Sequence, residues 1–124
     1  MNRKDAHLTE VRDKLVGSEH KRSSHWPALE KKFLKEHSSC AACGSTSKLN
    51  VHHIKPFHLF PELELVESNL VTLCMDNHCH ILLGHGGNFK AYNPQCLEDV
   101  EKVSHDFGLL TEVAQQAKKD RLFE

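Results

Sequence analysis

Four of the five cysteines stand in two close pairs, and this feature restricts the fold more than any other. Cys40 and Cys43 have two residues between them, and Cys74 and Cys79 have four. Four thiolates are the ligands of many structural zinc ions, which hold them in a tetrahedron. An ion bound by both pairs would close the segment 44–73 into a loop. The spacing therefore predicts a four-cysteine zinc site that fixes the middle of the chain.

The second cysteine pair leaves the fourth ligand open, because its gap is wider than the usual two residues. His78 competes with Cys79 for that position. The alternative for all four cysteines is burial as free thiols, which behave as small hydrophobic residues. Gly44, directly after Cys43, lets backbone N–H groups approach sulfur and favours the metal. Cys96 is left over, and we predict that it is a free thiol at the start of a helix.

The cysteine count also bears on the compartment. An odd number of cysteines, in a chain whose first ten residues are polar and charged, argues against a secreted disulfide framework. No stretch approaches the roughly 20 apolar residues of a membrane span. A length of 124 residues suits one domain. We therefore expect a single domain in the cytoplasm, with reduced cysteines and no membrane partner.

Charge is unevenly distributed along the chain. The net charge is −1, which is not typical of a strongly basic DNA-binding protein. Residues 1–40 hold nine Lys and Arg against six Asp and Glu. Attraction to phosphate would come from this third of the chain and from bound metal. A solvated helix face explains the same charges equally well.

Hydrophobic periodicity and turn residues predict a mixed α and β chain. Helices are expected at 4–16, 26–37, 78–83, 95–108 and 109–124, and strands at 49–54 and 70–73. In the second helix the buried side chains are expected to be Trp26, Leu29, Phe33 and Leu34. Phe89 and Tyr92 are expected to pack in the core. The histidines expected on the surface are His7, His20, His25, His37, His58 and His105.

Two adjacent histidines, His52 and His53, end the first predicted strand. Neighbouring residues on a strand point to opposite faces, so the two rings suit two different tasks. A neutral imidazole can take a proton from water near pH 7, whereas a metal-bound imidazole helps to hold a divalent ion. His80, on the short predicted helix, can approach the same ion from the facing side. Metal-assisted hydrolysis of a phosphodiester needs both tasks.

A third metal ligand is harder to choose. His85 follows His80 by five positions, and helical neighbours on one face are three or four apart. His85 therefore reaches the ion only if Gly84 breaks the helix. His78 would point away. We choose His85, with water or a phosphate oxygen as the alternative.

The central part of the chain resembles the HNH endonucleases that carry a zinc finger. The resemblance covers about 38–94 and rests on the order of the motifs at 40–44, 49–56, 69–74 and 79–80. It implies an α+β fold with a small ββα-metal (His-Me finger) core, flanked by N- and C-terminal helices. Residues 20–37 are also similar to the lead-in of small phage or prokaryotic members. Residues 1–124 would then be one HNH nuclease domain, with a helical lead-in at 1–37, the core at 38–94 and C-terminal helices at 95–124.

The resemblance also implies roles for individual residues. His53 would be the general base, His52 and His80 would bind a catalytic divalent ion, and Asn69 would be the central asparagine. Asn69 either holds the loop and His53 in position, which we favour, or binds the metal. The implied cofactors are a structural Zn²⁺ and one catalytic ion, which is Mg²⁺, Mn²⁺, Ni²⁺ or Zn²⁺. Lys55 and Lys90 flank the site as phosphate contacts, although solvated lysines are an equal alternative.

The sequence thus predicts a metal-dependent DNA endonuclease, and the resemblance implies products with 5′-phosphate ends. With no recognition region in view, its sequence specificity is expected to be low or to come from a partner protein. The alternative is a non-catalytic zinc module that binds DNA or protein. A weaker alternative makes the histidines a second structural zinc site. His52, His53, Asn69 and His80 favour the nuclease, since a purely structural finger does not need them.

Overall fold

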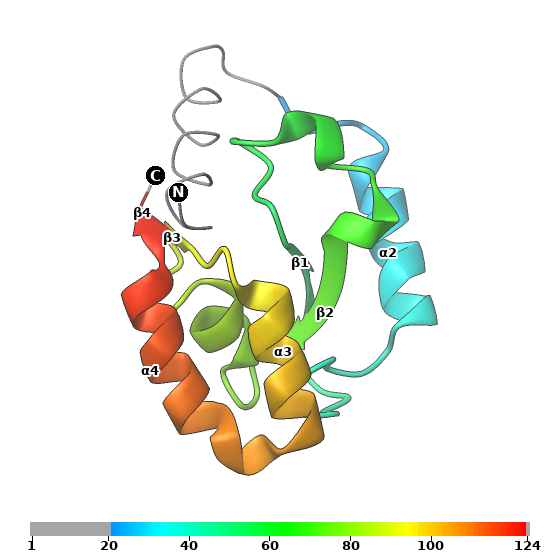
Figure 1. Ribbon diagram of the computed structural model, residues 1–124. Helices are drawn as coiled ribbons and strands as arrows, with labels where there is room; N and C mark the ends of the chain where they lie inside the picture. The colour runs from blue at the N-terminus through cyan, green and yellow to red at the C-terminus, as the bar shows by residue number, and fades with distance from the viewer. Residues whose placement is uncertain (1–20, 124) are drawn as a thin grey trace.

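The computed structural model describes residues 21–123, and the predicted helix at 4–16 lies outside them, as do His7 and His20. The three α-helices of the described part are α2 (Trp26–Glu36), α3 (Cys96–His105) and α4 (Leu110–Asp120). Single turns of helix form η1 (Pro61–Leu63), η2 (Glu67–Asn69), η3 (His80–Gly84) and η4 (Phe107–Leu109). The strands are β1 (Leu49–His53), β2 (Leu70–Cys74), β3 (Ala91–Tyr92) and β4 (Leu122–Phe123). The predicted α+β class is confirmed (Figure 1).

The β1–β2 hairpin lies at the centre and is covered on both faces (Figure 1). The strands are antiparallel, with His52 opposite Val71 and His53 opposite Leu70. Because side chains alternate along a strand, His53 and Leu70 share the face that α2 covers, and His52 and Val71 share the other. Every residue of β2 is buried. The hairpin therefore separates the two neighbouring histidines onto opposite sides of one thin layer.

Helix α2 begins where Pro27 fits the first turn, and it packs on the hairpin through one stripe. Phe33 is buried against Val51 and Leu70. Trp26, Leu29 and Leu34, which were expected to be buried, are only partly covered. The prediction was too strong for these three side chains, because the helix lies on the outside of the hairpin and is itself uncovered.

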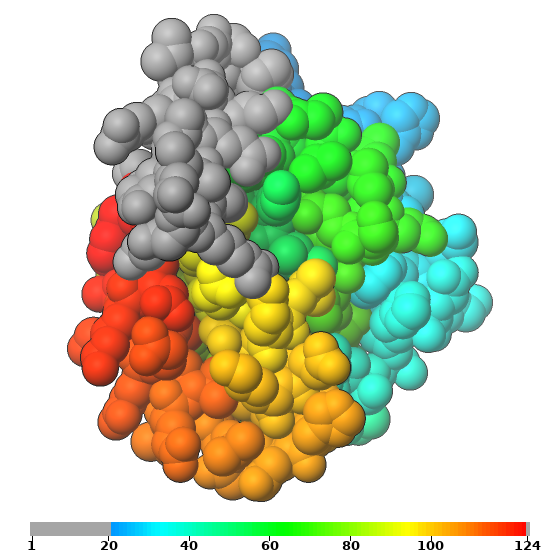
Figure 2. All heavy atoms as spheres, in the orientation of Figure 1, coloured from blue at the N-terminus to red at the C-terminus, as the bar shows by residue number. Residues whose placement is uncertain are grey.

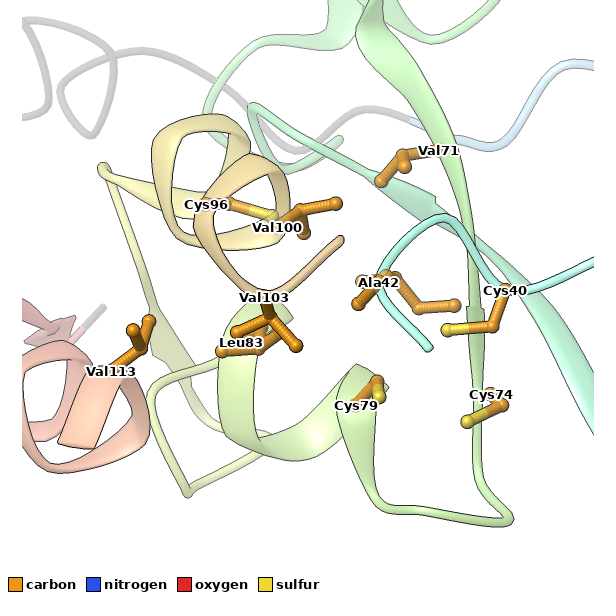
Figure 3. Packing of buried hydrophobic residues seen from close by; sticks show 11 residues of the cluster. Cys40, Ala42, Val71, Cys74, Cys79, Leu83, Cys96, Val100, Val103 and Val113 are labelled. Atoms are coloured by element: carbon orange, nitrogen blue, oxygen red, sulfur yellow. The ribbon is translucent and has the colours of Figure 1, made fainter. Parts of the chain in front are cut away.

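The other face of the hairpin is covered by η3, α3 and α4. Figure 2 shows α3 and α4 side by side on one face of the molecule, with α2 on another side. Their valines and leucines pack around Leu83 of η3, which is fully buried. Figure 3 shows this cluster running into the thiols of Cys40, Cys74 and Cys79. The hydrophobic core and the cysteine cluster are thus one continuous interior.

Two predictions about the C-terminal part are wrong. The predicted helix at 109–124 ends at Asp120, where the backbone of Arg121 becomes extended and β4 pairs with β3. The reason is that Leu122 is buried beside Phe60 and Tyr92, a contact that a continuing helix would not make. Phe89 is 49% exposed and does not join the core, whereas Tyr92 does. None of the helices within 21–123 is long and apolar enough to span a bilayer.

Candidate metal centres and active-site pocket

The four paired cysteines meet in space. Their Sγ atoms all lie within 4.8 Å of one another, and Cys43 Sγ is 3.5 Å from Cys74 Sγ. Cys40, Cys74 and Cys79 are buried, and none of the described cysteines forms a disulfide. The exposed His78 is not part of this group. A cluster of four thiols from two distant turns fits one tetrahedral zinc ion.

Hydrogen-bond donors point at two of the four sulfurs. Asn77 donates its backbone N–H to Cys74 Sγ at 3.4 Å and its side-chain N–H to Cys43 Sγ at 3.3 Å. A hydrogen bond with the Cys79 thiol lowers the pKa of Cys40 to about 4, whereas the same contact raises the pKa of Cys79 and burial raises the pKa of Cys74. Donors aimed at sulfur orient metal-bound thiolates and stabilise their charge. The site thus has both the ligands and the outer contacts of a structural metal centre.

Three histidines form a second cluster on the opposite side of β1 from α2. His52 comes from β1, His80 begins η3 and His85 follows η3, and one ring nitrogen of each lies within 4.8 Å of the others. The Nε2 atom of His80 is 3.1 Å from His52 Nδ1 and 3.2 Å from His85 Nε2. The structure therefore brings together the three residues that the sequence suggested as ligands of a divalent ion.

The spacing of five between His80 and His85 is explained by the kind of helix between them. The turn at His80–Gly84 is a π-helix, in which hydrogen bonds run from residue i to residue i+5. A wider turn places residues five apart on one face, which an α-helix would not do. His85 was expected to reach the ion only if the helix ended at Gly84; the helix does end there, and its turn is of the π type.

The hydrogen bonds of the three rings fit a metal ion. His80 donates Nδ1–H to Asn50 Oδ1 at 3.1 Å, and His85 donates Nδ1–H to the Ala91 carbonyl at 2.9 Å. Each neutral imidazole has a single ring proton, so both Nε2 atoms carry lone pairs. Two lone pairs 3.2 Å apart cannot bond to each other, whereas a cation between them would satisfy both. In the third ring, His52 Nδ1 faces His80 Nε2 at 3.1 Å, and His52 Nε2 is buried without a partner among the described residues.

The three rings are neutral in the folded chain. Burial, reinforced by the neighbouring rings, holds the pKa of His52 well below its usual value. Burial also lowers the pKa of His80 to about 4, and it lowers the pKa of His85. A neutral imidazole is the form that binds metal. Protons therefore compete weakly with a cation for this cluster at neutral pH.

His53 lies on the α2 side of the hairpin, with its ring centroid 4.4 Å from that of Trp26. Its Nε2–H donates to the Glu64 carbonyl at 3.0 Å, which leaves the lone pair on Nδ1. Burial lowers the pKa of His53, although the Glu64 carbonyl opposes the shift. A neutral ring with a fixed tautomer is able to accept a proton.

Asn69 makes contacts that hold the loop after His53. Its Oδ1 accepts the Lys55 N–H at 2.9 Å, and its Nδ2–H donates to the Lys55 carbonyl at 3.1 Å. A further hydrogen bond of 3.4 Å reaches the Leu63 carbonyl. Both ends of the Asn69 amide are thus bonded to backbone, and its role in positioning His53 stays a prediction.

His53 and the cluster of His52, His80 and His85 line one pocket of about 290 Å³. Its lining residues are Arg22, Val51, His52, His53, Pro56, Phe57, His58, His80, His85 and Phe89. Neither predicted phosphate contact lines it. The Lys55 ammonium lies 5.1 Å from the centre of the Phe60 ring, and Lys90 is exposed. The phosphate contacts of these two lysines stay predictions.

The match to a known protein family covers the part of the chain that holds both the cysteine cluster and the histidine cluster. Residues 40–86 match the family model described as HNH endonuclease. This stretch of the chain is an HNH family domain. The match begins at the first cysteine of the zinc cluster and ends just beyond His85. No curated protein and no solved structure matches the chain.

Several contacts in the HNH domain were missed by the sequence argument. Asn50, which receives the His80 proton, could have been found, because it lies two residues before His52 on the same strand face. Glu64 and Arg22 could not, because no local pattern places either one beside His53. Glu64 is 5% exposed, an unusual burial for a carboxylate, and sequence gives no sign of it.

Residues beyond the HNH match hold the third histidine. The Ala91 carbonyl that accepts from His85 belongs to β3, where Ala91 stands opposite Phe123 of β4. Arg121 donates to the Gly86 carbonyl at 3.0 Å, directly after His85. The chain beyond residue 86 is therefore part of the support of the histidine cluster.

Gly84 gives a direct test of how tightly the histidine cluster of the HNH domain is packed. A Cβ at Gly84 would lie 3.0 Å from His52 Cε1 and 3.1 Å from His80 Cδ2, closer than ordinary contacts. We expect Gly84→Ala to push the rings apart and to lower the affinity of zinc-loaded protein for Co²⁺ by roughly tenfold or more. Visible absorption of Co²⁺ bound by imidazoles gives the affinity.

A matched control for Gly84→Ala is Ser104→Ala on the exposed surface of α3, far from the cluster. It is expected to bind Co²⁺ as the unmodified protein does. The same affinity in Gly84→Ala and in Ser104→Ala would show that the rings have room to spare and would contradict the prediction.

Proposed function

We propose that this protein is a metal-dependent DNA endonuclease whose phosphodiester substrate enters the pocket of the HNH domain. One observation carries the proposal. Facing lone pairs of His80 and His85 meet His52 at one wall of the pocket, and the neutral His53 opens onto the same pocket. A cation site beside a proton acceptor is what metal-assisted hydrolysis requires.

In this proposal, His52, His80 and His85 hold one divalent ion, which is Mg²⁺, Mn²⁺, Ni²⁺ or Zn²⁺. Such an ion supplies positive charge that neutralises the phosphate and stabilises the leaving oxygen. Asn50 and the Ala91 carbonyl keep two of the rings in the tautomer that binds metal. The π turn keeps His85 on the side of His80.

His53 acts on water in this proposal. Its Nε2–H is engaged by the Glu64 carbonyl, so Nδ1 takes the proton from the attacking water. Trp26 packs against the ring, and Asn69 fixes the loop that begins directly after His53. These contacts reduce the freedom of the base before the substrate arrives, and a positioned base needs less reorganisation during the reaction.

The other parts of the proposal concern the framework and the cellular setting. Cys40, Cys43, Cys74 and Cys79 bind a structural zinc ion. Residues 1–124 form a single domain, which acts on DNA in the cytoplasm of a prokaryote or as a phage product. Sequence specificity is low, or a partner protein supplies it. Lys55 and Lys90 contact phosphates outside the pocket.

Nicking of a supercoiled plasmid tests the proposed function. Zinc-loaded protein is mixed with plasmid and with Mg²⁺, Mn²⁺ or Ni²⁺, and the same protein without a second ion and with EDTA serves as control. We expect nicked or linear plasmid only in the presence of the ion, with 5′-phosphate ends that a ligase can join directly. Absence of cleavage with every ion would favour the non-catalytic zinc module instead.

A further inference from the structure

We propose that Arg22, outside the HNH match, binds the phosphate of the substrate in the pocket that His53 faces; this inference rests on the proposed nuclease function. Arg22 is the only lining residue of the pocket with a permanent charge, and no Asp or Glu lines it in the described part of the chain. A phosphate entering this pocket therefore meets one fixed cation of the protein.

The Arg22 guanidinium is held by two aromatic rings. Its central carbon lies 4.4 Å from the centre of the Phe57 ring and 5.6 Å from that of Trp26. Arginine stacks well on aromatic faces because its charge is planar and delocalised. Trp26 also packs on His53. The same tryptophan thus contacts both the predicted base and the cation.

The acidic partner of Arg22 leaves room for a ligand. Arg22 Nη1 lies 3.6 Å from Glu64 Oε2, which is longer than an N–H···O hydrogen bond. The two carboxylate oxygens of Glu64 instead accept the backbone N–H of Ser23 at 3.1 and 3.2 Å. This pair therefore does not use up the guanidinium donors. The Arg22 side chain is 51% exposed, so a phosphate can reach it.

Glu64 contacts both the Arg22 cation and His53, the predicted general base. Its carboxylate holds Ser23 and attracts Arg22, while its carbonyl accepts the proton on His53 Nε2. One buried residue thus fixes two groups from distant parts of the chain on the same pocket. A phosphate bound by Arg22 would be placed beside His53, which is where attacking water must be activated. The planar fork of arginine also suits two phosphate oxygens at once, unlike a lysine.

The test compares Arg22→Ala and Arg22→Lys with Lys21→Ala, which removes the same charge from the exposed neighbouring residue outside the pocket lining. A short fluorescein-labelled DNA duplex is titrated with zinc-loaded protein at several salt concentrations, with the second ion omitted. Plasmid cleavage with the ion is measured in parallel. Zinc content and the melting temperature show that each variant is folded.

We expect Arg22→Ala to bind the duplex roughly 10- to 100-fold more weakly than Lys21→Ala, because a hydrogen-bonded charge pair is lost. For Arg22→Ala, the slope of the logarithm of the DNA-binding constant against the logarithm of the salt concentration should become less steep by about one. Arg22→Lys keeps the charge beside Glu64 and should keep the slope, but bind about tenfold more weakly. Both variants should also cleave more slowly than Lys21→Ala.

Two results would overturn the inference, and they differ. If the unmodified protein cleaves DNA while Arg22→Ala and Arg22→Lys bind and cleave as Lys21→Ala does, Arg22 has no role at the phosphate and the proposed function still stands. If the unmodified protein neither binds the duplex nor cleaves plasmid with any ion, the proposed function fails and the inference fails with it.

Discussion

Replacement of His53 by alanine is expected to lower the rate of plasmid cleavage by roughly 10²- to 10⁴-fold, the usual contribution of a positioned general base. His53 lines the pocket from the α2 side of the hairpin, and the Glu64 carbonyl accepts its Nε2–H, which leaves the lone pair on Nδ1. Three other histidines of the pocket, His52, His80 and His85, contact one another. Nicking rates at saturating DNA and ion measure the effect.

The control for His53→Ala is His105→Ala, the same substitution at an exposed residue of α3. Zinc content and cooperative unfolding should be kept in both variants, with a lower melting temperature for His53→Ala, which loses the hydrogen bond to Glu64 and the packing against Trp26. Turnover of His53→Ala at the rate of His105→Ala would remove the general-base role and leave the metal cluster to be explained otherwise.

Loss of one zinc ligand is expected to have the largest effect on stability. Cys74 is fully buried, and its Sγ lies 3.5 Å from that of Cys43. The binding energy of a structural zinc ion, on the order of 10 kcal/mol, becomes folding energy when no site exists in the unfolded chain. We expect Cys74→Ser to lose the zinc and its cooperative unfolding transition, as followed by circular dichroism and metal analysis.

Cys96→Ser is the matched control, because Cys96 is equally buried but lies outside the cysteine cluster. Burial raises the pKa of Cys96 to about 12, and its sulfur is not part of the four-thiol cluster. This variant should keep its zinc and unfold cooperatively, with a cost of roughly 1–3 kcal/mol for the buried hydroxyl. Similar melting and zinc content in the two variants would mean that the cluster does not depend on metal.

Much of the fold and of the site could be predicted because the relevant signals are local. The helix at Trp26 is marked by Pro27 and an apolar stripe, and the hairpin by alternating side chains. The period of two along a strand was enough to separate His52 from His53. Thiol pairs at short spacing are a strong sign of a metal, whatever lies between them.

The remainder depended on contacts that no local pattern encodes. The spacing of apolar residues does not reveal a π turn. His85 could therefore be chosen as a ligand from the sequence, but its position beside His80 could not be explained. Arg22 and Glu64 are brought together across a large sequence separation. The end of α4 was misjudged because the burial of Leu122 against Phe60 and Tyr92, and not helix propensity, sets the backbone there.

The support of His85 by β3, β4 and Arg121 has a consequence for the order in which the centre is completed. A nascent chain that has left the ribosome only as far as residue 86 carries all three histidines. It does not yet carry Ala91, Arg121 or Phe123, and so His85 has neither its proton acceptor nor the paired strand behind it. The contacts that fix the third histidine are therefore complete only when translation has passed Phe123, well after His85 itself has been added to the chain.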